Sequence, residues 1–191
     1  MATQNRTSES RQILIGICGG IAAYKMAEVV STLVKRGDEV TVAMTRDATR
    51  FIGEVTFQSL SGRPVYTDPW SHSESLESPH IALARQADVM LVSPCTMDML
   101  ARLVAGHADD AVSLLAASID RSVCPVLLAP SMNETMLAQP STRRNLGQLA
   151  EDGFRVIEPG TGWQACRTEG AGRLPEPSEL VSALDAAIGT S

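Results

Sequence analysis

The sequence predicts a single α/β domain in which a doubly wound, mainly parallel sheet lies between two layers of helices, of the Rossmann or flavodoxin-like type. Three observations predict this fold. Short apolar runs alternate with helical patterns from residue 13 onwards. The strand-like runs are largely apolar, as is typical of parallel strands covered on both faces. The chain has 191 residues, a length that suits one domain.

The first half of the chain is expected to form a buried strand over 13–19, a helix over 21–36, a strand over 38–45, a helix over about 46–60 and a short strand over 64–66. In the first helix, apolar residues recur at near-3.6 spacing, and Gly37 stands where a terminating glycine belongs. Thr45 is a candidate N-cap for the second helix, which Gly62 ends. A polar stretch over 71–79 follows.

The second half is expected to form a helix over 80–87, a strand over 88–94, helices over 97–106 and 111–119, a strand over 124–130, a helical stretch over 134–151 interrupted at Pro140, a last strand over 154–159 and a closing helix over 178–189. Residues 1–12 are expected to be a disordered tail, so the folded domain covers 13–191. Residues 160–175 are rich in glycine and are expected to form a loop without regular structure, as active-site lids often do.

Composition excludes several classes of function. The 16 basic and 22 acidic residues give a net charge of −6, which argues against binding to nucleic acid or to an anionic membrane. The four cysteines form no C-x-x-C pair and have no metal-ligand spacing, so no metal site is expected. No apolar run is long enough for a membrane span or a signal peptide, so we expect a cytoplasmic protein with reduced thiols. Aromatic residues are only 4%, too few for one chain to build a site on stacking.

The first strand-to-helix turn is a candidate phosphate site. In a sheet of this type, ligands bind at the carboxyl ends of the strands. Gly19 and Gly20 lie there, and the following helix offers unpaired N–H groups and the positive end of its dipole. Cys18 and Ile21 replace two glycines of the dinucleotide motif, and the second strand ends at Thr45 without an acidic residue, so a mononucleotide fits better. The alternative is that the glycines only form a tight turn.

Polar residues also follow two later strands. Residues 93–96 read Ser-Pro-Cys-Thr, and residues 129–133 read Ala-Pro-Ser-Met-Asn. Either loop alone could be ordinary helix capping, but polar loops at successive strand ends favour a binding site. Among the histidines, His80 is the candidate for proton transfer near neutral pH. In the glycine-rich segment, Cys166 stands beside Arg167 and is a candidate reactive thiol.

Four short motifs make the sequence resemble the flavin-dependent cysteine decarboxylases. The family's Gly-Ile-Ala-Ala-Tyr-Lys turn is present at residues 20–25, and its His-Ile-x-Leu-Ala motif at 80–84. Its Pro-x-Met-Asn-x-x-Met motif is present at 130–136. Its cysteine-bearing clamp, Ala-Cys-Gly followed by Gly-x-Gly-Arg-Met, is similar to residues 165–174. The resemblance covers nearly the whole chain, and the member that the chain most resembles acts in coenzyme A biosynthesis.

The resemblance implies an FMN cofactor held by Gly19, Gly20, Ile21, Thr45, Ser93, Thr96 and Asp98. The catalytic residues that it implies are His80 as a base, Asn133 at the substrate carboxylate and Cys166 as the final proton donor. The substrate-binding residues that it implies are Asn133, Met136, Ala165 and Arg173. It also implies that the chain assembles as a trimer or as a dodecamer of four trimers.

The reaction that the resemblance implies is the decarboxylation of 4′-phosphopantothenoylcysteine to 4′-phosphopantetheine. A carboxylate leaves as CO₂ only if the carbanion is stabilised, and oxidation of the cysteinyl thiol to a thioaldehyde supplies that electron sink, with flavin taking the hydride. The resulting ene-thiol is then reduced. The anionic substrate phosphate would depend on Lys25, Arg167, Arg173 and backbone amides.

The sequence departs from the family pattern in one loop and in the clamp. The family's Pro-Ala-Ser-Ala-Asn-Thr flavin loop reads Pro-Cys-Thr-Met-Asp-Met at residues 94–99, so Asp98 stands where the family has an asparagine and Met99 where it has a threonine. In the clamp, Arg167 replaces the glycine and Leu174 replaces the methionine. Two alternative functions therefore stay open. One is the oxidative decarboxylation of a peptide's C-terminal cysteine, which stops at the ene-thiol and needs no donor such as Cys166. The other is a non-catalytic, flavin-binding regulatory subunit, for which Asp98 and Arg167 are the best arguments. A flavin prenyltransferase is disfavoured by the His-Ile and Met-Asn motifs.

Overall fold

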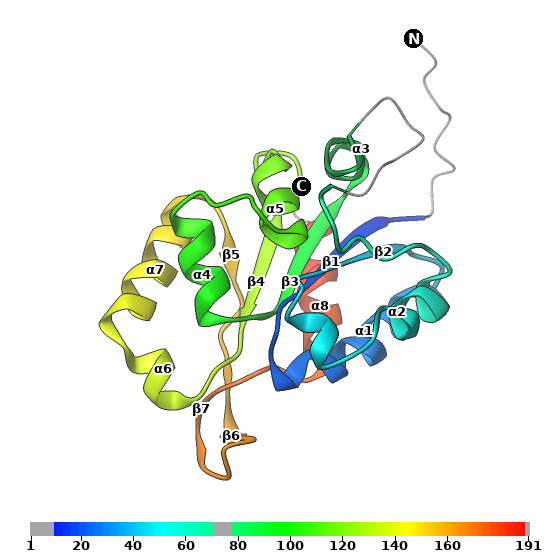
Figure 1. The fold of residues 1–191 in the computed structure, drawn as a ribbon. Helices are drawn as coiled ribbons and strands as arrows, with labels where there is room; N and C mark the ends of the chain where they lie inside the picture. Colours follow the sequence, from blue (N-terminus) through cyan, green and yellow to red (C-terminus); the bar gives the residue numbers. More distant parts are fainter. Residues whose placement is uncertain (1–9, 71–77, 190–191) are drawn as a thin grey trace, which may run out of the picture.

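The computed structural model describes residues 10–70 and 78–189 (Figure 1). The strands are β1 (Gln12–Ile17), β2 (Glu39–Met44), β3 (Val89–Cys95), β4 (Val126–Pro130), β5 (Arg155–Val156), β6 (Gly160–Trp163) and β7 (Glu169–Arg173). The α-helices are α1 (Met26–Lys35), α2 (Glu54–Ser61), α3 (Pro79–Gln86), α4 (Met97–Val104), α5 (Ala111–Ser118), α6 (Glu134–Ala138), α7 (Pro140–Glu151) and α8 (Pro177–Ile188). Two 3₁₀ helices, η1 (Ile21–Lys25) and η2 (Ala48–Arg50), precede α1 and α2.

The predicted fold class is confirmed. Strands β1 to β5 form a parallel sheet in the order β2-β1-β3-β4-β5, which is the flavodoxin-like order. In the register, Ile13 pairs with Val40 of β2 and with Val89 of β3. The chain runs from β1 to β2 and returns to the other side of β1 as β3. The direction of winding therefore reverses between β1 and β3, and the crevice at their carboxyl ends is where such folds bind ligands.

Two hydrophobic clusters cover the two faces of the sheet. Alternate residues of β1, namely Ile13, Ile15 and Ile17, are buried in one cluster with α1 and α8. Leu14, which points to the opposite face, is buried in the other cluster with α4, α5 and α7. Figure 1 shows the same division, with α4 to α7 on one side of the sheet and α1, α2 and α8 on the other. Because both faces are covered, the strands are apolar at successive positions.

Most of the predicted helix boundaries agree with the structure within a few residues. Gly37 and Gly62 follow α1 and α2 with φ of 97° and 68°, the left-handed conformation expected of glycines that end helices. Pro140 separates α6 from α7, as the sequence indicates. The helix expected over 21–36 begins as the 3₁₀ helix η1, and the one expected over 46–60 is divided into η2 and α2. Among the described residues, no helix is long and apolar enough to cross a membrane.

Three expectations need correction. The segment 64–66 forms only an isolated bridge, between Tyr66 and Ala43, rather than a strand. The sheet strand expected over 154–159 is reduced to Arg155–Val156. Of the expected tail, residues 1–9 lie outside the described residues, but Gln12 begins β1 and Arg11 forms ion pairs with Asp38 and Asp185. Most of the polar stretch 71–79 also lies outside the described residues.

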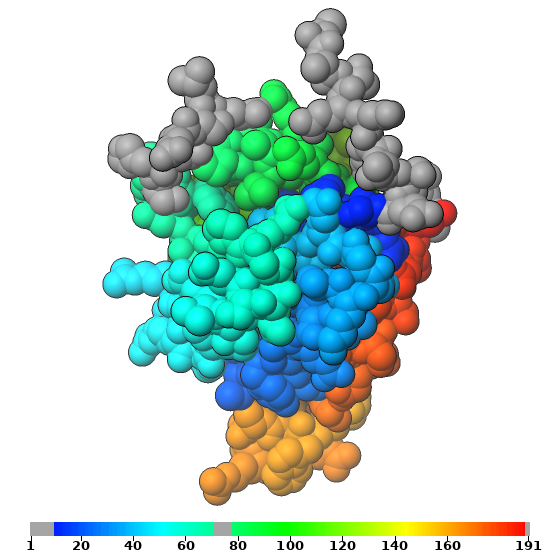
Figure 2. Space-filling view, turned by 90° about the vertical axis from the view of Figure 1, so that its right-hand side faces the viewer, coloured from blue at the N-terminus to red at the C-terminus, as the bar shows by residue number. Residues whose placement is uncertain are grey.

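The glycine-rich segment is the largest correction, because it forms a β-hairpin. Strands β6 and β7 pair antiparallel, with Trp163 opposite Glu169 and Gly162 opposite Gly170. The hairpin separates β5 from α8 and lies beyond the carboxyl edge of the parallel sheet in Figure 1. Figure 2 shows the same segment, in orange, projecting from the body of the molecule. It therefore extends from the body of the domain at the edge where a ligand is expected.

Candidate functional site

A large cleft opens at the carboxyl edge of the sheet. Its volume is about 1510 Å³, larger than the several hundred Å³ typical of a site for one small molecule. Its walls come from the turn after β1, the loops after β2, β3 and β4, and the hairpin. The polar loops that the sequence places at successive strand ends do meet here. Segments that are more than a hundred residues apart in sequence thus share one cavity.

The turn after β1 forms the floor of the cleft. A Cβ on Gly19 would lie 2.6 Å from the Cβ of Asp47 and 3.0 Å from its carbonyl carbon, so this glycine is required by close contact with the chain after β2. A Cβ on Gly20 would meet only Pro94 and Thr96, at 3.7 and 3.8 Å. In the described chain, no group accepts a hydrogen bond from the amides of Gly19 or Gly20. These amides are therefore available to an anion.

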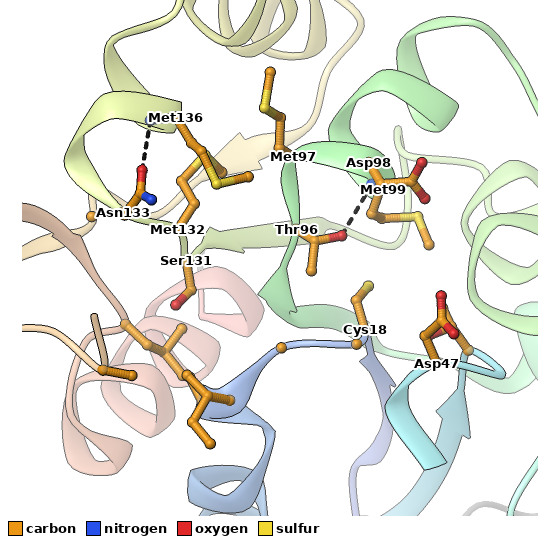
Figure 3. A pocket seen from close by; sticks show the side chains of 18 of the residues that line it. Cys18, Asp47, Thr96, Met97, Asp98, Met99, Ser131, Met132, Asn133 and Met136 are labelled. Carbon is orange, nitrogen blue, oxygen red and sulfur yellow. Dashed lines mark hydrogen bonds between the residues drawn. The ribbon is translucent and has the colours of Figure 1, made fainter. Parts of the chain in front are cut away.

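Two threonines support this floor through hydrogen bonds to the chain that follows them. Thr45 is not the N-cap that the sequence predicted, because η2 has Asp47 at its N-cap and α2 has Gly53. The hydroxyl oxygen of Thr45 instead accepts a hydrogen bond from the amide of Ala48 (3.2 Å) at the start of η2. The hydroxyl oxygen of Thr96 accepts one from the amide of Met99 (3.2 Å) at the start of α4 (Figure 3). Each hydroxyl keeps its own proton for donation, because this contact uses only the oxygen.

Asp98 does not present an uncompensated negative charge to the cleft. Its carboxylate accepts a hydrogen bond from Nε of Arg102, one turn later in α4, at 2.7 Å. Arg102 also donates to Asp109 at 2.8 Å, and this hydrogen bond lowers the pKa of Asp109. All three residues line the cleft. The departure from asparagine at position 98 is thus accompanied by a guanidinium that balances its charge.

The loop after β4 supplies the opposite wall. The amide of Ser131 donates to the carbonyl of Cys95 (3.0 Å), which ties this loop to the end of β3. Asn133 caps α6, with Oδ1 accepting from the amide of Met136 at 2.8 Å, so its Nδ2 is free to donate elsewhere. Figure 3 shows Met132 and Met136 on this wall, with Met97 near them.

The hairpin lies directly against the loop after β4. The amide of Met132 donates to the carbonyl of Gly172 at 3.1 Å. A Cβ on Gly172 would be 2.2 Å from the carbonyl oxygen of Met132, and one on Gly170 would be 2.7 Å from Oε2 of Glu134. The two glycines of the Gly-Ala-Gly segment are therefore required by this close packing.

The tip of the hairpin presents Cys166 to the cleft. The amide of Arg167 donates to the carbonyl of Gln164 (2.9 Å), and the amide of Gln164 donates to the carbonyl of Thr168 (2.8 Å). This is a three-residue loop whose last residue, Arg167, has φ of 64°, a position that favours glycine. The left-handed conformation at this position of the turn explains why the family has a glycine there. Arg167 adopts the same conformation, which is less favourable in free energy for a residue with a Cβ.

The other cysteines are structural. Cys18 and Cys95 are buried, and burial raises the pKa of each thiol far above its ordinary value. Cys124 is also buried, and burial raises its pKa to about 11. Cys166 is exposed, and all four thiols are free. Chemistry that needs an accessible thiol therefore points to Cys166.

Two basic residues at the cleft share one carboxylate. Nζ of Lys25 lies 3.1 Å from Oε2 of Glu176, and Arg173 also bonds to Glu176. The hydrogen bond from Lys25 lowers the pKa of Glu176. Lys25 and Arg173 line the cleft, and its lining as a whole has five basic and four acidic residues. The cleft is thus locally positive although the whole chain carries a net charge of −6.

Most of the residues proposed from the sequence meet in this cleft. Those that line it are Gly19, Gly20, Ile21, Thr45, Thr96, Asp98, Asn133, Met136, Ala165, Cys166 and Arg173. Three others do not: Ser93, Arg167 and His80. Ser93 is buried at the end of β3, where its hydroxyl has no hydrogen-bond partner among the described residues.

His80 lies away from the cleft of its own chain. It is the second residue of α3, and α3 leads into the amino end of β3, whereas the cleft lies at the carboxyl end. Figure 1 shows α3 at the opposite end of the sheet from the β6–β7 hairpin. His80 is half-buried, and its Nδ1 is buried without a hydrogen-bond partner among the described residues.

Sequence reasoning did not identify several residues of the cleft. Tyr24 and Trp163 line it and are 60% and 66% exposed, so the chain does bring aromatic rings to its site despite their scarcity. Arg102 could have been found from its spacing of four residues after Asp98 in a predicted helix. Met97 could have been found because it directly follows the polar loop after β3.

Comparisons with known proteins found relatives in both sequence and structure. A family model described as Flavoprotein matches residues 1–189. The coenzyme A biosynthesis bifunctional protein CoaBC of Mycobacterium tuberculosis is 44% identical over 172 residues, which are 90% of this chain and 40% of that protein. The chain thus spans less than half the length of this curated relative.

Solved structures share the fold over nearly their whole length. A cysteine-to-serine mutant of PPC decarboxylase, complexed with pantothenoylaminoethenethiol, matches with a TM-score of 0.84 and 27% identity, over 93% of this chain and 97% of that one. The FMN-dependent cysteine decarboxylase SpaF matches with a TM-score of 0.77 and 30% identity, over the same shares of the two chains.

Proposed function

This chain belongs to the flavoprotein family, and on that premise we propose that it binds FMN in the cleft and decarboxylates 4′-phosphopantothenoylcysteine to 4′-phosphopantetheine. One observation carries the proposal. The phosphate turn at Gly19 and Gly20, the Asn133 cap and the exposed thiol of Cys166 line the same cleft, although they are far apart in sequence. The relative named for coenzyme A biosynthesis supports the choice of substrate.

The residues of the cleft fit a flavin mononucleotide. The amides of Gly19 and Gly20 have no hydrogen-bond partner among the described residues, and they lie beside the start of a helix, where a phosphate binds well. The absence of a Cβ at Gly20 leaves the floor open towards Thr96. Met97, Met132 and Met136 have polarizable thioether sulfurs, which make favourable contacts with an aromatic ring. The buried hydroxyl of Ser93 is a further candidate partner for the cofactor.

When bound, the flavin supplies the two-electron chemistry that turns a cysteinyl thiol into an electron sink for loss of CO₂. This chain's residues bind the substrate and move its protons. Nδ2 of Asn133 donates to the substrate carboxylate, since Oδ1 is occupied by capping. Met136 and Ala165 contact the substrate beside it. Cys166 supplies the last proton from the hairpin tip.

Lys25 and Arg173 form the proposed subsite for the substrate phosphate. Both line the cleft, and both are bonded to Glu176. A phosphate dianion would compete with this carboxylate for the two cations, and Arg can bind it through two parallel hydrogen bonds. Arg167, which does not line the cleft, is not needed for this subsite.

We further propose that the working unit is a trimer, or a dodecamer of trimers, in which a second copy completes the site. The position of His80 supports this, because in its own chain it lies on α3, away from the cleft that needs a base. Large apolar side chains are exposed at the cleft, among them Ile21, which is 59% exposed. Exposed apolar surface of this kind favours burial against a second copy of the chain. A cytoplasmic location is consistent with the exposed Cys166, whose role requires a reduced thiol.

The test is to incubate the FMN-loaded protein with phosphopantothenoylcysteine and identify the product by mass. A product that is lighter than the substrate by CO₂ alone shows the complete reaction, whereas an ene-thiol is lighter by CO₂ and two hydrogens. In the Cys166→Ser variant, the ene-thiol should accumulate instead. A protein that stays colourless and takes up no added FMN contradicts the cofactor proposal, and FMN binding without release of CO₂ favours a regulatory subunit.

The second candidate is the decarboxylation of a peptide's C-terminal cysteine, with the ene-thiol as product. The likeness to SpaF, an FMN-dependent cysteine decarboxylase that is 30% identical and is not named for coenzyme A biosynthesis, favours a cysteinyl substrate of another kind. The exposed thiol of Cys166 in the cleft argues against it, because a reaction that stops at the ene-thiol needs no such donor. Offering a peptide that ends in cysteine beside the phosphorylated substrate separates the two.

A further inference from the structure

The side chain of Gln164 is fixed inside the hairpin. Its Nε2 donates to the carbonyl of Ala171 at 2.7 Å and approaches that of Gly170 at 3.5 Å, both on the facing strand β7. The residue is 8% exposed, so this amide is shielded from water. With Nε2 fixed, the other end of the amide has one orientation, and Oε1 lies 3.5 Å from Sγ of Cys166.

Thr168 contacts the same sulfur from the other side of the loop. Its Oγ1 lies 3.0 Å from Sγ of Cys166. The backbone holds Thr168 opposite Gln164, because the amide of Gln164 donates to the carbonyl of Thr168 at 2.8 Å. The sulfhydryl of Cys166 therefore lies between an amide oxygen and a hydroxyl, at the point where the hairpin enters the cleft.

We propose that Gln164 and Thr168 are positioning residues that hold the Cys166 sulfhydryl for its proton transfer to the ene-thiol. The proposal rests on the function proposed above, in which Cys166 completes the reaction. A thiol carries one proton, and a sulfur accepts hydrogen bonds weakly. The arrangement that satisfies all three groups has the S–H group donating to Gln164 Oε1 and the Thr168 hydroxyl donating to Sγ.

One of these two contacts, that with Thr168, also supports the product of the transfer. The S–H bond breaks, and its proton forms a C–H bond on one carbon of the ene-thiol. The neighbouring carbon would receive the hydride that reduced FMN supplies when bound, so that the carbon–carbon double bond becomes single. The sulfur is left as a thiolate, which the Thr168 hydroxyl stabilises by donating to it. Water then returns a proton to Sγ.

A purely structural role for these residues is the alternative. Gln164 cross-links the two strands of the hairpin, so its loss will loosen the hairpin whatever happens at Cys166. Thr168 allows a cleaner test, because Val has the same shape and a similar β propensity but lacks the hydroxyl. Ser retains the hydroxyl and serves as the matched control.

The first measurement is the ratio of ene-thiol to saturated product formed by the FMN-loaded protein from phosphopantothenoylcysteine. For Thr168→Val we expect this ratio to rise about fivefold, the factor that corresponds to losing one hydrogen bond. Thr168→Ser should restore the parent ratio. Gln164→Met should also raise the ratio, and combining it with Thr168→Val should give less than the product of the two separate effects, because both act on one sulfur.

The second measurement needs no substrate. Iodoacetamide should alkylate Cys166 alone in the folded protein, since the other three cysteines are buried. In Thr168→Val we expect alkylation about two- to threefold slower, because a less stabilised thiolate is scarcer although somewhat more nucleophilic. Thr168→Ser should react at the parent rate, and Cys166→Ser supplies the blank.

The two measurements separate the proposals. If the parent protein releases no CO₂, the proposed function fails, while the alkylation rates still decide whether Thr168 acts on Sγ. An unchanged product ratio in Thr168→Val, or an unchanged alkylation rate, overturns the positioning role. So does a Ser variant that behaves like the Val variant, because the effect then does not follow the hydroxyl.

Discussion

Replacing Arg167 by glycine should stabilise the hairpin that carries Cys166. Arg167 has φ of 64° at the last position of the three-residue loop between β6 and β7. In this left-handed region, a side chain brings Cβ too close to the backbone. Glycine has no Cβ, and the hydrogen bond from the amide of residue 167 to the carbonyl of Gln164 would remain.

The expected gain is small but measurable. A left-handed residue other than glycine costs about 1–2 kcal/mol, and the greater freedom of glycine in the unfolded chain offsets about 0.5–1 kcal/mol of this. The net stabilisation of Arg167→Gly is therefore roughly 0.5–1 kcal/mol, which raises Tm by about 1–4 °C in a protein of this size.

Thermal unfolding measures the global effect, and hydrogen exchange at the amide of residue 167 measures the local one. Arg167→Ala is the control, because it removes the same charge but keeps a Cβ in the left-handed conformation. We expect slower exchange and a higher Tm in Arg167→Gly and neither change in Arg167→Ala. If the Ala variant is stabilised as much as the Gly variant, charge rather than backbone strain determines the effect, and the reasoning fails.

Three further outcomes follow from the structure. His80→Asn should abolish CO₂ release while FMN stays bound, as measured by product mass and flavin absorbance; unchanged turnover removes His80 from catalysis. Glu176→Gln should lower Tm at neutral pH. Folding lowers the pKa of the Glu176 carboxyl, and such a carboxyl stabilises the folded state at every pH above its ordinary pKa. The difference in Tm should shrink to nothing as the pH falls through the lowered pKa, and a pH-independent difference contradicts the ion-pair explanation. Gly172→Ala should detach the hairpin at a cost of about 1–3 kcal/mol beyond its backbone strain, because its Cβ would meet the Met132 carbonyl oxygen at 2.2 Å. Gly37→Ala is the matched control, since Gly37 also has a positive φ (97° against 109° for Gly172) but no atom within 4 Å of an added Cβ, and equal losses of Tm in the two variants would rule out the clash.

Local rules in the sequence were sufficient for the sheet and for much of the cleft. Apolar runs that alternate with helical patterns indicated β1 to β4, and the position of polar loops at the carboxyl ends of strands indicated Thr45, Thr96 and Asn133. These predictions succeeded because strand burial and helix capping depend on residues that are neighbours in sequence. Thr96 and Asn133 cap the helices that follow them, Thr45 accepts a hydrogen bond from the amide of Ala48 without being a helix cap, and all three line the cleft.

The hairpin could not be found in this way. Its strands contain four glycines and lack the alternation of β-branched and polar residues that indicates a strand. What stabilises them is contact with a distant part of the chain, since Gly170 and Gly172 pack on Glu134 and Met132. The pairing of Arg102 with Asp109 likewise depends on where the loop returns after α4.

The sequence by itself determined the class of fold, the edge of the sheet that is expected to bind a ligand and several of the residues that line the cleft, because periodicity, capping and short motifs are local. Only the tertiary structure decided that the glycine-rich segment is a docked hairpin, that Gln164 and Thr168 flank the Cys166 sulfur, and that His80 lies away from the cleft of its own chain. These facts depend on which surfaces meet in space, and surfaces meet only after the sheet has brought the loops together.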